Sequence, residues 1–298
     1  MLKPSAWGRK TVVQSHPPRP TSTKLLDTPL ETYSVRDRVL FVKREDLCAP
    51  EGAPPFSKIR GLYKHLSNLK CAGIETVGYT ETSISMAGWG VAWAAKQLGM
   101  KAVIFNPVYK DTHEELEYHR YQWEKWGAEL VDLDAGMARV NFNISRKILK
   151  SEYKKSVLLP LGLPLRETID ATIEEAEALK QTSWGSVVVN IGSGTICSGL
   201  LNAFGDITPI YGIMGRTGNV GDKKMKIISH SQVLYFGAIN FQVIDPGYEY
   251  TDSVEVDAPF PCNKYYDAKA YKWLVENIHL LRGPILFWNI GSDTPTNK

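Results

Sequence analysis

The stretch Lys43-Arg-Glu-Asp-Leu-Cys-Ala-Pro-Glu-Gly-Ala-Pro-Pro-Phe-Ser-Lys-Ile-Arg-Gly61 holds a lysine, Lys58, where a turn passes into a helix. Ser57 is a candidate N-cap, and apolar residues recur downstream at helical spacing, at Ile59, Leu62, Leu66 and Leu69. The partial positive charge of a helix N-terminus, together with burial, lowers the pKa of a lysine placed there. Lys58 is therefore a candidate nucleophile for a Schiff base. The alternative is a solvated surface cation.

The composition is that of a globular protein with room for two lobes. The chain has 298 residues, of which 43% are hydrophobic and 22% charged. No apolar run approaches the roughly 20 residues that span a bilayer, and the N-terminus has no signal-peptide pattern. The four cysteines are scattered and the histidines do not cluster with them. We therefore expect a cytoplasmic protein with free thiols, no metal site and no membrane partner.

Strand-like apolar runs alternate with helical patterns along most of the chain, which favours parallel β-α-β units and an α/β architecture. The predicted strands are Val39–Val42, Thr76–Tyr79, Ala102–Phe105, Leu130–Leu133, Val157–Pro160, Val187–Ile191, Pro209–Ile213, Val233–Phe236 and Ile285–Asn289. The predicted helices are Gly61–Cys71, Gly88–Leu98, Glu114–Trp126, Leu165–Lys180 and Tyr265–Asn277. We expect a large domain over residues 1–74 and 134–298, and a small α/β domain over residues 75–133.

A glycine-rich turn follows the apolar strand that ends at Ile191. It reads Gly192-Ser193-Gly194-Thr195, and a helical pattern comes directly after it. Strand, glycine turn and helix start together present backbone N–H groups and hydroxyls to an anion. The turn is therefore a candidate phosphate site, with a purely structural turn as the alternative. It is neither a Walker loop nor a dinucleotide fingerprint.

The N-terminal segment is basic, although the net charge of the whole chain is only +3. Five cations and no acid precede Asp27, namely Lys3, Arg9, Lys10, Arg19 and Lys24. One interpretation is an ordinary loose terminus. The other is an arm that contacts an anionic partner such as modified DNA.

Taken in order, these segments resemble the fold-type II pyridoxal-phosphate (PLP) enzymes, and within them 1-aminocyclopropane-1-carboxylate (ACC) deaminase and D-cysteine desulfhydrase. The likeness runs over roughly residues 38–293. Ser57-Lys58-Ile59-Arg60 stands where the family has Asn-Lys-x-Arg, and Tyr265–Lys269 resembles Val-Tyr-Glu-Gly-Lys. The other matching segments are Lys43–Leu47, the helix Gly88–Met100, the turn Gly192–Thr195 and the closing strand Ile285–Ser292.

The resemblance implies a homodimer whose two lobes are each a mostly parallel sheet flanked by helices, with PLP as cofactor. It implies that Lys58 forms the Schiff base and that Gly192, Ser193, Gly194 and Thr195 hold the phosphate. It places Asp267 against the pyridine nitrogen, and it makes Ser85 and Tyr266 candidates for catalysis or substrate contact. The alternatives are a helix N-terminal acid for Asp267 and an aromatic core residue for Tyr266.

One departure from the family pattern bears on the reaction. Where the family has Ser-Asn-His, this chain reads Ser85-Met86-Ala87. The family asparagine bonds the phenolic oxygen of the cofactor, and methionine cannot donate that bond. The expected activity is lyase or deaminase chemistry on the amino group of a small amino-acid-like substrate. Two alternatives stay open: an enzyme that modifies an amino-acid adduct on DNA, including viral DNA, and a non-catalytic binding protein.

Overall fold

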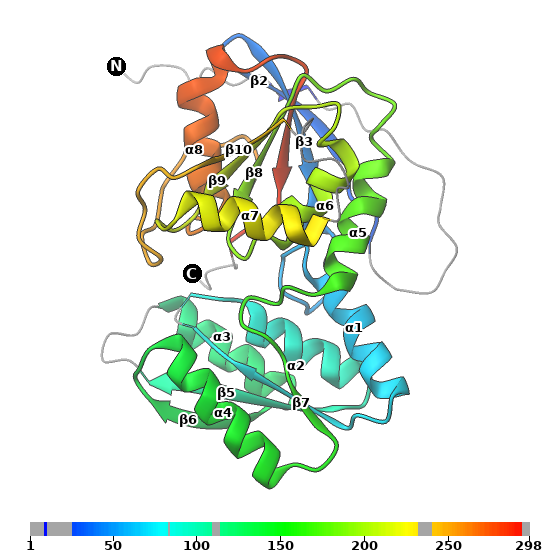
Figure 1. The fold of residues 1–298 in the computed structure, drawn as a ribbon, viewed down its shortest axis with the longest axis vertical. Coiled ribbons are helices and arrows are strands. Elements are labelled where there is room, and N and C mark those ends of the chain that lie inside the picture. The colour runs from blue at the N-terminus through cyan, green and yellow to red at the C-terminus, as the bar shows by residue number, and fades with distance from the viewer. Residues whose placement is uncertain (1–8, 11–25, 83, 109–113, 232–239, 294–298) are drawn as a thin grey trace. The chain divides into compact units, whose positions relative to one another are not determined.

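The computed structural model describes residues 9–10, 26–82, 84–108, 114–231 and 240–293 (Figure 1). The chain divides into two compact units. The large unit comprises residues 1–50, 55–57 and 169–298, and the small unit comprises residues 51–54 and 58–168. Each unit is an α/β assembly of its own, so the predicted α/β class is confirmed.

The large unit is built on a seven-stranded sheet of order β1-β2-β3-β11-β8-β9-β10. The first three strands pair antiparallel, and β3, β11, β8, β9 and β10 run parallel. The strands are β1 (Arg9–Lys10), β2 (Leu30–Val35), β3 (Arg38–Arg44), β8 (Ser186–Ile191), β9 (Ile210–Met214), β10 (Phe241–Ile244) and β11 (Ile285–Asn289). The helices are α5 (Arg166–Glu177), α6 (Thr195–Phe204), α7 (Val220–Ser231) and α8 (Asp267–Asn277). The first residues of α5 belong to the small unit. Short 3-10 turns lie at Glu45–Leu47 and Ile278–Leu280.

Helices cover both faces of this sheet (Figure 1). One core cluster joins the sheet to α6, α7 and the end of α5, and a second joins it to α8. All six residues of β8 are consequently buried, as expected for a parallel strand covered on both sides. The loops after β8, β9 and β11 leave the same carboxyl edge of the sheet, the edge at which open α/β folds bind ligands.

The small unit is a four-stranded parallel sheet of order β6-β5-β4-β7. Its strands are β4 (Thr76–Thr80), β5 (Lys101–Val108), β6 (Glu129–Asp134) and β7 (Ser156–Leu158). Its helices are α1 (Ile59–Cys71), α2 (Ala87–Gln97), α3 (Glu114–Lys125) and α4 (Ala138–Glu152). Helix α2 packs on β4 and β5 and is flanked by α1 and α3, while α4 packs on β4 and β7. Nine of the eleven residues of α2 are buried as a result.

The observed units differ in their bounds from the predicted division at residues 75–133. Helix α1 packs on α2, β7 pairs with β4, and α4 covers both strands, so all three elements lie in the small unit. Ser57 is not the N-cap of α1. Lys58 holds that position without a side-chain capping bond. The predicted strand Val233–Phe236 lies outside the described residues, as do Lys3, Arg19 and Lys24 of the basic arm. No helix of the described part is long and apolar enough to cross a membrane.

Candidate functional site

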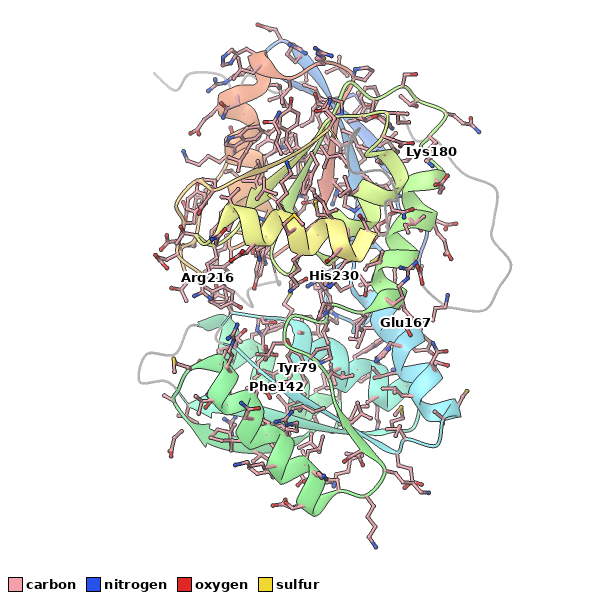
Figure 2. The ribbon with its side chains drawn as sticks, viewed as in Figure 1. Tyr79, Phe142, Glu167, Lys180, Arg216 and His230 are labelled. Carbon is pink, nitrogen blue, oxygen red and sulfur yellow. The ribbon has the colours of Figure 1, made fainter. Side chains whose placement is uncertain are left out.

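Lys58 is anchored by a turn of the small unit. Its ammonium donates a 2.7 Å hydrogen bond to the carbonyl of Gly162, and the N–H of Gly162 donates to the hydroxyl of Tyr79, at 3.2 Å. Gly162 has φ +73°, a conformation that glycine adopts without strain. Tyr79, labelled in Figure 2, comes from buried strand β4 and is 1% exposed. Lys58 is therefore half-buried, and its amine is hydrogen-bonded to the Gly162 carbonyl rather than extended into solvent.

The loop that follows β4 is organised by a buried carboxyl group, Glu81. Its oxygens accept the N–H groups of Thr82, at 2.9 Å, and Gly88, at 2.6 Å. A Cβ at Gly88 would overlap the Glu81 carboxylate, so the first turn of α2 requires glycine there. Burial raises the pKa of Glu81 to about 8, which leaves the group largely protonated at neutral pH.

Ser85 lies in this loop, and its hydroxyl is committed to the loop's own structure. The hydroxyl accepts the N–H of Ala87, at 3.1 Å, and hydrogen-bonds Glu81. Met86 is the N-cap of α2, and its side chain is 6% exposed. Among the described residues, Lys58 bonds the carbonyl of Gly162, whereas Ser85 bonds Glu81 and the N–H of Ala87.

In the large unit, the predicted phosphate turn is the N-terminus of α6. Gly194 is the N-cap, with φ +92°, and a Cβ there would lie 2.7 Å from Cγ1 of Ile227. The hydroxyls of Ser193 and Thr195 lie 2.8 Å apart. Nothing lies within 4 Å of a Cβ built on Gly192. The first N–H groups of a helix have no intrahelical acceptor, so the turn is a cradle suited to an anion.

This turn forms part of the wall of a cavity of about 320 Å³. The volume is at the lower end of the ~300–1,000 Å³ typical of small-molecule sites. Gly192 and Tyr266 both line the cavity, so the structure brings these two predicted residues together. The hydroxyl of Tyr266 lies 3.2 Å from that of Tyr250, and its backbone carbonyl accepts a bond from Asn190. The remaining wall is formed by Ile191, by the end of β9 and the segment after it (residues 214–219), by Lys223 of α7 and by Tyr250.

Asp267 is the first residue of α8 and is 1% exposed. Its two oxygens accept the N–H groups of Ile290, at 2.9 Å, and Gly291, at 3.1 Å. Burial, and secondarily the nearby charge of Asp46, raises the pKa of Asp267 to about 8. A buried carboxyl that is costly to ionise fits a position opposite a protonated ring nitrogen, whose positive charge would relieve that cost.

The Lys43–Leu47 segment is a structural ion network. Lys43 lies 2.9 Å from the carboxylate of Glu175, and Arg44 forms two bonds to Asp46, at 2.8 and 2.7 Å. Asn289 at the end of β11 also donates to Asp46. Removing one partner of such a buried pair typically costs about 3–5 kcal/mol. The network therefore fixes the ends of β3 and β11, and β11 leads directly to Ile290 and Gly291, whose N–H groups bind Asp267.

Several candidate site residues were not anticipated from the sequence. Glu81, Tyr79 and Gly162 carry no motif, and only the fold shows that they surround Ser85 and Lys58. Arg216 and Lys223 line the cavity. A sequence signal exists for these two, because a polar glycine-rich segment, Gly215–Asn219, follows an apolar strand and precedes a lysine-rich helix.

Comparison with known proteins identifies the family. No protein-family model matches the chain. The chain is 38% identical, over 282 residues, to a glycyl-dTMP PLP-dependent decarboxylase of Pseudomonas phage M6, and the match covers 89% of this chain and 98% of that protein. A crystal structure of an ACC deaminase homologue superposes with a TM-score of 0.75 at 21% identity, over 89% of each chain. A PLP-dependent aspartate racemase superposes with a TM-score of 0.63 at 16% identity, over 91% of this chain and 92% of that one.

The structural likenesses establish the fold, and the sequence match over nearly the whole phage enzyme establishes the family. The predicted resemblance is confirmed at both levels. The chain belongs to the fold-type II pyridoxal-phosphate-dependent enzymes, in the family of the phage glycyl-dTMP decarboxylase.

Proposed function

We propose that the chain is a PLP-dependent decarboxylase whose substrate is a glycyl group attached to a thymidine nucleotide. The observation that carries this proposal is the 38% identity to the phage glycyl-dTMP decarboxylase over 98% of that enzyme's length. The reaction would break the bond between the α-carbon and the carboxylate, release CO₂ and return one proton to the α-carbon. The deaminase hypothesis came from the resemblance of sequence motifs, and the solved ACC deaminase homologue, at 21% identity, supports only the shared fold.

Each predicted site residue would have its own role in this reaction. Pyridoxal phosphate, when bound, supplies an electron sink for the bond that breaks. The Gly192–Thr195 turn would bind its phosphate through backbone N–H groups and hydroxyls. Asp267 would hold the proton of the ring nitrogen. Lys58 would attach the cofactor covalently through its amine and is the candidate to return the proton to the α-carbon. Tyr266, in the cavity wall, is the candidate for substrate contact.

The test is direct decarboxylation by the purified holoprotein. We expect CO₂ release and the loss of one carboxyl group, seen by mass spectrometry, from a nucleotide that carries glycine on its thymine. Lys58→Ala should abolish both signals. Ammonia release from the same substrate would instead favour the deaminase reading. A protein that binds no cofactor and leaves the substrate unchanged would favour the non-catalytic alternative.

A further inference from the structure

Cationic side chains lie in and beside the cavity of the large unit, next to the glycine turn. Arg216 and Lys223 line the same cavity as Gly192. Lys226 follows Lys223 by three residues on α7, which places the two side chains on one face of the helix. Figure 2 shows Arg216 at the N-terminal end of α7 and His230 at the opposite end. We refer to Arg216, Lys223 and Lys226 as the cation cluster.

The cation cluster lacks carboxylate partners among the residues that the structure describes. Asp245 is bonded to the cavity wall: its carboxylate accepts hydrogen bonds from the hydroxyl of Thr217 and the N–H of Gly218, and within the described part of the chain it forms no ion pair with the cation cluster. Burial lowers the pKa of Lys223, and the charges of Lys226 and Arg216 lower it further. The positive charges of Arg216 and Lys226 repel that of Lys223, and an anionic ligand would relieve that repulsion.

The cation cluster is additional to what a single phosphate requires. The glycine turn already offers helix N-terminal N–H groups and the hydroxyls of Ser193 and Thr195. Lys223 donates one hydrogen bond, of 2.8 Å, to the carbonyl of Gly192, and two of its three N–H donors remain for a ligand. Arg216 is exposed at the cavity wall and carries a planar set of donors suited to phosphate oxygens. Gly192 of the glycine turn and Arg216 and Lys223 of the cation cluster therefore line one cavity.

We propose that the cation cluster binds the phosphate of the nucleotide to which the substrate amino acid is attached. The inference rests on the proposed function, because only a nucleotide substrate brings a second phosphate to a site that binds PLP. That phosphate is either the monoester of a free nucleotide or a diester of a DNA strand. Both present the same anionic oxygens to Arg216.

Binding of unreactive thymidine compounds to the holoprotein tests the proposal. The probes are thymidine, thymidine 5′-monophosphate and a short oligothymidylate, with affinities measured by calorimetry. We expect the monophosphate to bind at least about tenfold more tightly than thymidine, as charge-assisted hydrogen bonds to phosphate predict. Arg216→Gln and Lys226→Gln should each remove much of that difference. Lys180→Gln is the matched control, because Lys180 is a lysine of the same unit that pairs with Glu177.

The absorbance of the bound cofactor and its dissociation constant provide the second readout. Arg216→Gln should leave both unchanged. If this variant instead releases the cofactor while its preference for the monophosphate persists, the cation cluster serves the PLP phosphate and the proposal is wrong. Equal binding of thymidine and its monophosphate by the wild type would also overturn it.

The oligothymidylate distinguishes the two sources of the phosphate. Tighter binding of the oligonucleotide, with a steep dependence on salt, identifies a DNA strand, and equal binding identifies the free nucleotide. Both results support the phosphate role. If phosphate-dependent binding occurs but no CO₂ is released from the glycyl substrate, the proposed reaction is wrong, and the proposed binding of the nucleotide phosphate by the cation cluster is supported. If glycyl nucleoside and glycyl nucleotide react with equal kcat/KM, the reaction stands and this inference fails.

Discussion

Two glycines of the phosphate turn should respond in opposite ways to the same substitution. In Gly194→Ala the new Cβ meets Cγ1 of Ile227 at 2.7 Å, and the backbone must keep φ at +92°. The left-handed conformation costs an alanine about 1–2 kcal/mol, and overpacking against Ile227 costs about 1–3 kcal/mol more. We therefore expect Gly194→Ala to lower the free energy of unfolding by about 2–5 kcal/mol, a large share of an ordinary domain's stability.

Gly192→Ala should leave folding intact and weaken cofactor binding. A Cβ on Gly192 has no neighbour within 4 Å, so the free energy of unfolding should change by less than about 0.5 kcal/mol. Gly192 lines the cavity, however, and an added methyl group would occupy space close to the phosphate cradle. We expect the dissociation constant for PLP to rise about tenfold or more, equivalent to about 1.4 kcal/mol.

The assay pairs urea denaturation of the cofactor-free proteins with titration of PLP followed by absorbance. Pyridoxal without its phosphate is the control ligand, and its affinity should be the same for wild type and Gly192→Ala. Wild-type affinity of Gly192→Ala for PLP would refute the cradle assignment. Unchanged unfolding of Gly194→Ala would refute the steric argument at Ile227.

Three further predictions concern ionisable side chains. Borohydride reduction of the holoprotein should fix the cofactor to Lys58; an adduct on Lys269, whose amine is bonded to two carbonyls, would contradict the assignment. The pKa of Asp267 rises from 3.8 to about 8 on folding, so the folded chain binds more protons than the unfolded chain between those pH values. The free energy of unfolding of the cofactor-free protein should therefore fall as the pH rises from about 4 to about 8. Asp267→Asn should flatten this dependence, as measured by urea denaturation. Glu81→Gln should destabilise the small unit by about 1–3 kcal/mol at pH 7, because the side-chain NH₂ group of glutamine cannot accept the backbone N–H that a Glu81 oxygen accepts. Unchanged unfolding, followed by circular dichroism, would argue against that geometry.

The parts of the fold that could be predicted are those in which local pattern and burial agree. The continuous apolar run of β8 and the glycine turn after it are readable because a strand covered on both faces has no polar positions. Helix α1 was predictable from its apolar spacing, but its first residue was not. Lys58 takes the N-cap position because the buried Ser57 forms no capping bond.

Prediction failed where tertiary pairing decides the assignment. Strand β7 is three residues long, and only its pairing with β4 places it and α4 in the small unit. Glu81 could not be identified as a buried acid, because nothing in Thr80-Glu81-Thr82 indicates that two backbone N–H groups enclose the carboxylate. The cation cluster likewise depends on the fold, which brings the loop after β9 and helix α7 to one cavity.

The loop from Glu81 to Ala87 also bears on which reaction the site supports. Deamination and elimination need a base to remove a proton and an acid to assist the leaving group. In this loop the Ser85 hydroxyl is already bonded to Glu81 and to the N–H of Ala87, and the buried Met86 side chain neither donates nor carries a proton. Decarboxylation needs no base at the α-carbon, since CO₂ departs without a proton and one proton is returned afterwards. The committed hydroxyl of Ser85 and the apolar side chain of Met86 are therefore compatible with the proposed decarboxylation, in which Lys58 is the candidate to supply that proton. If Ser85→Ala retains CO₂ release within about tenfold of wild type while Lys58→Ala does not, this division holds; a loss in Ser85→Ala as complete as that in Lys58→Ala would contradict it.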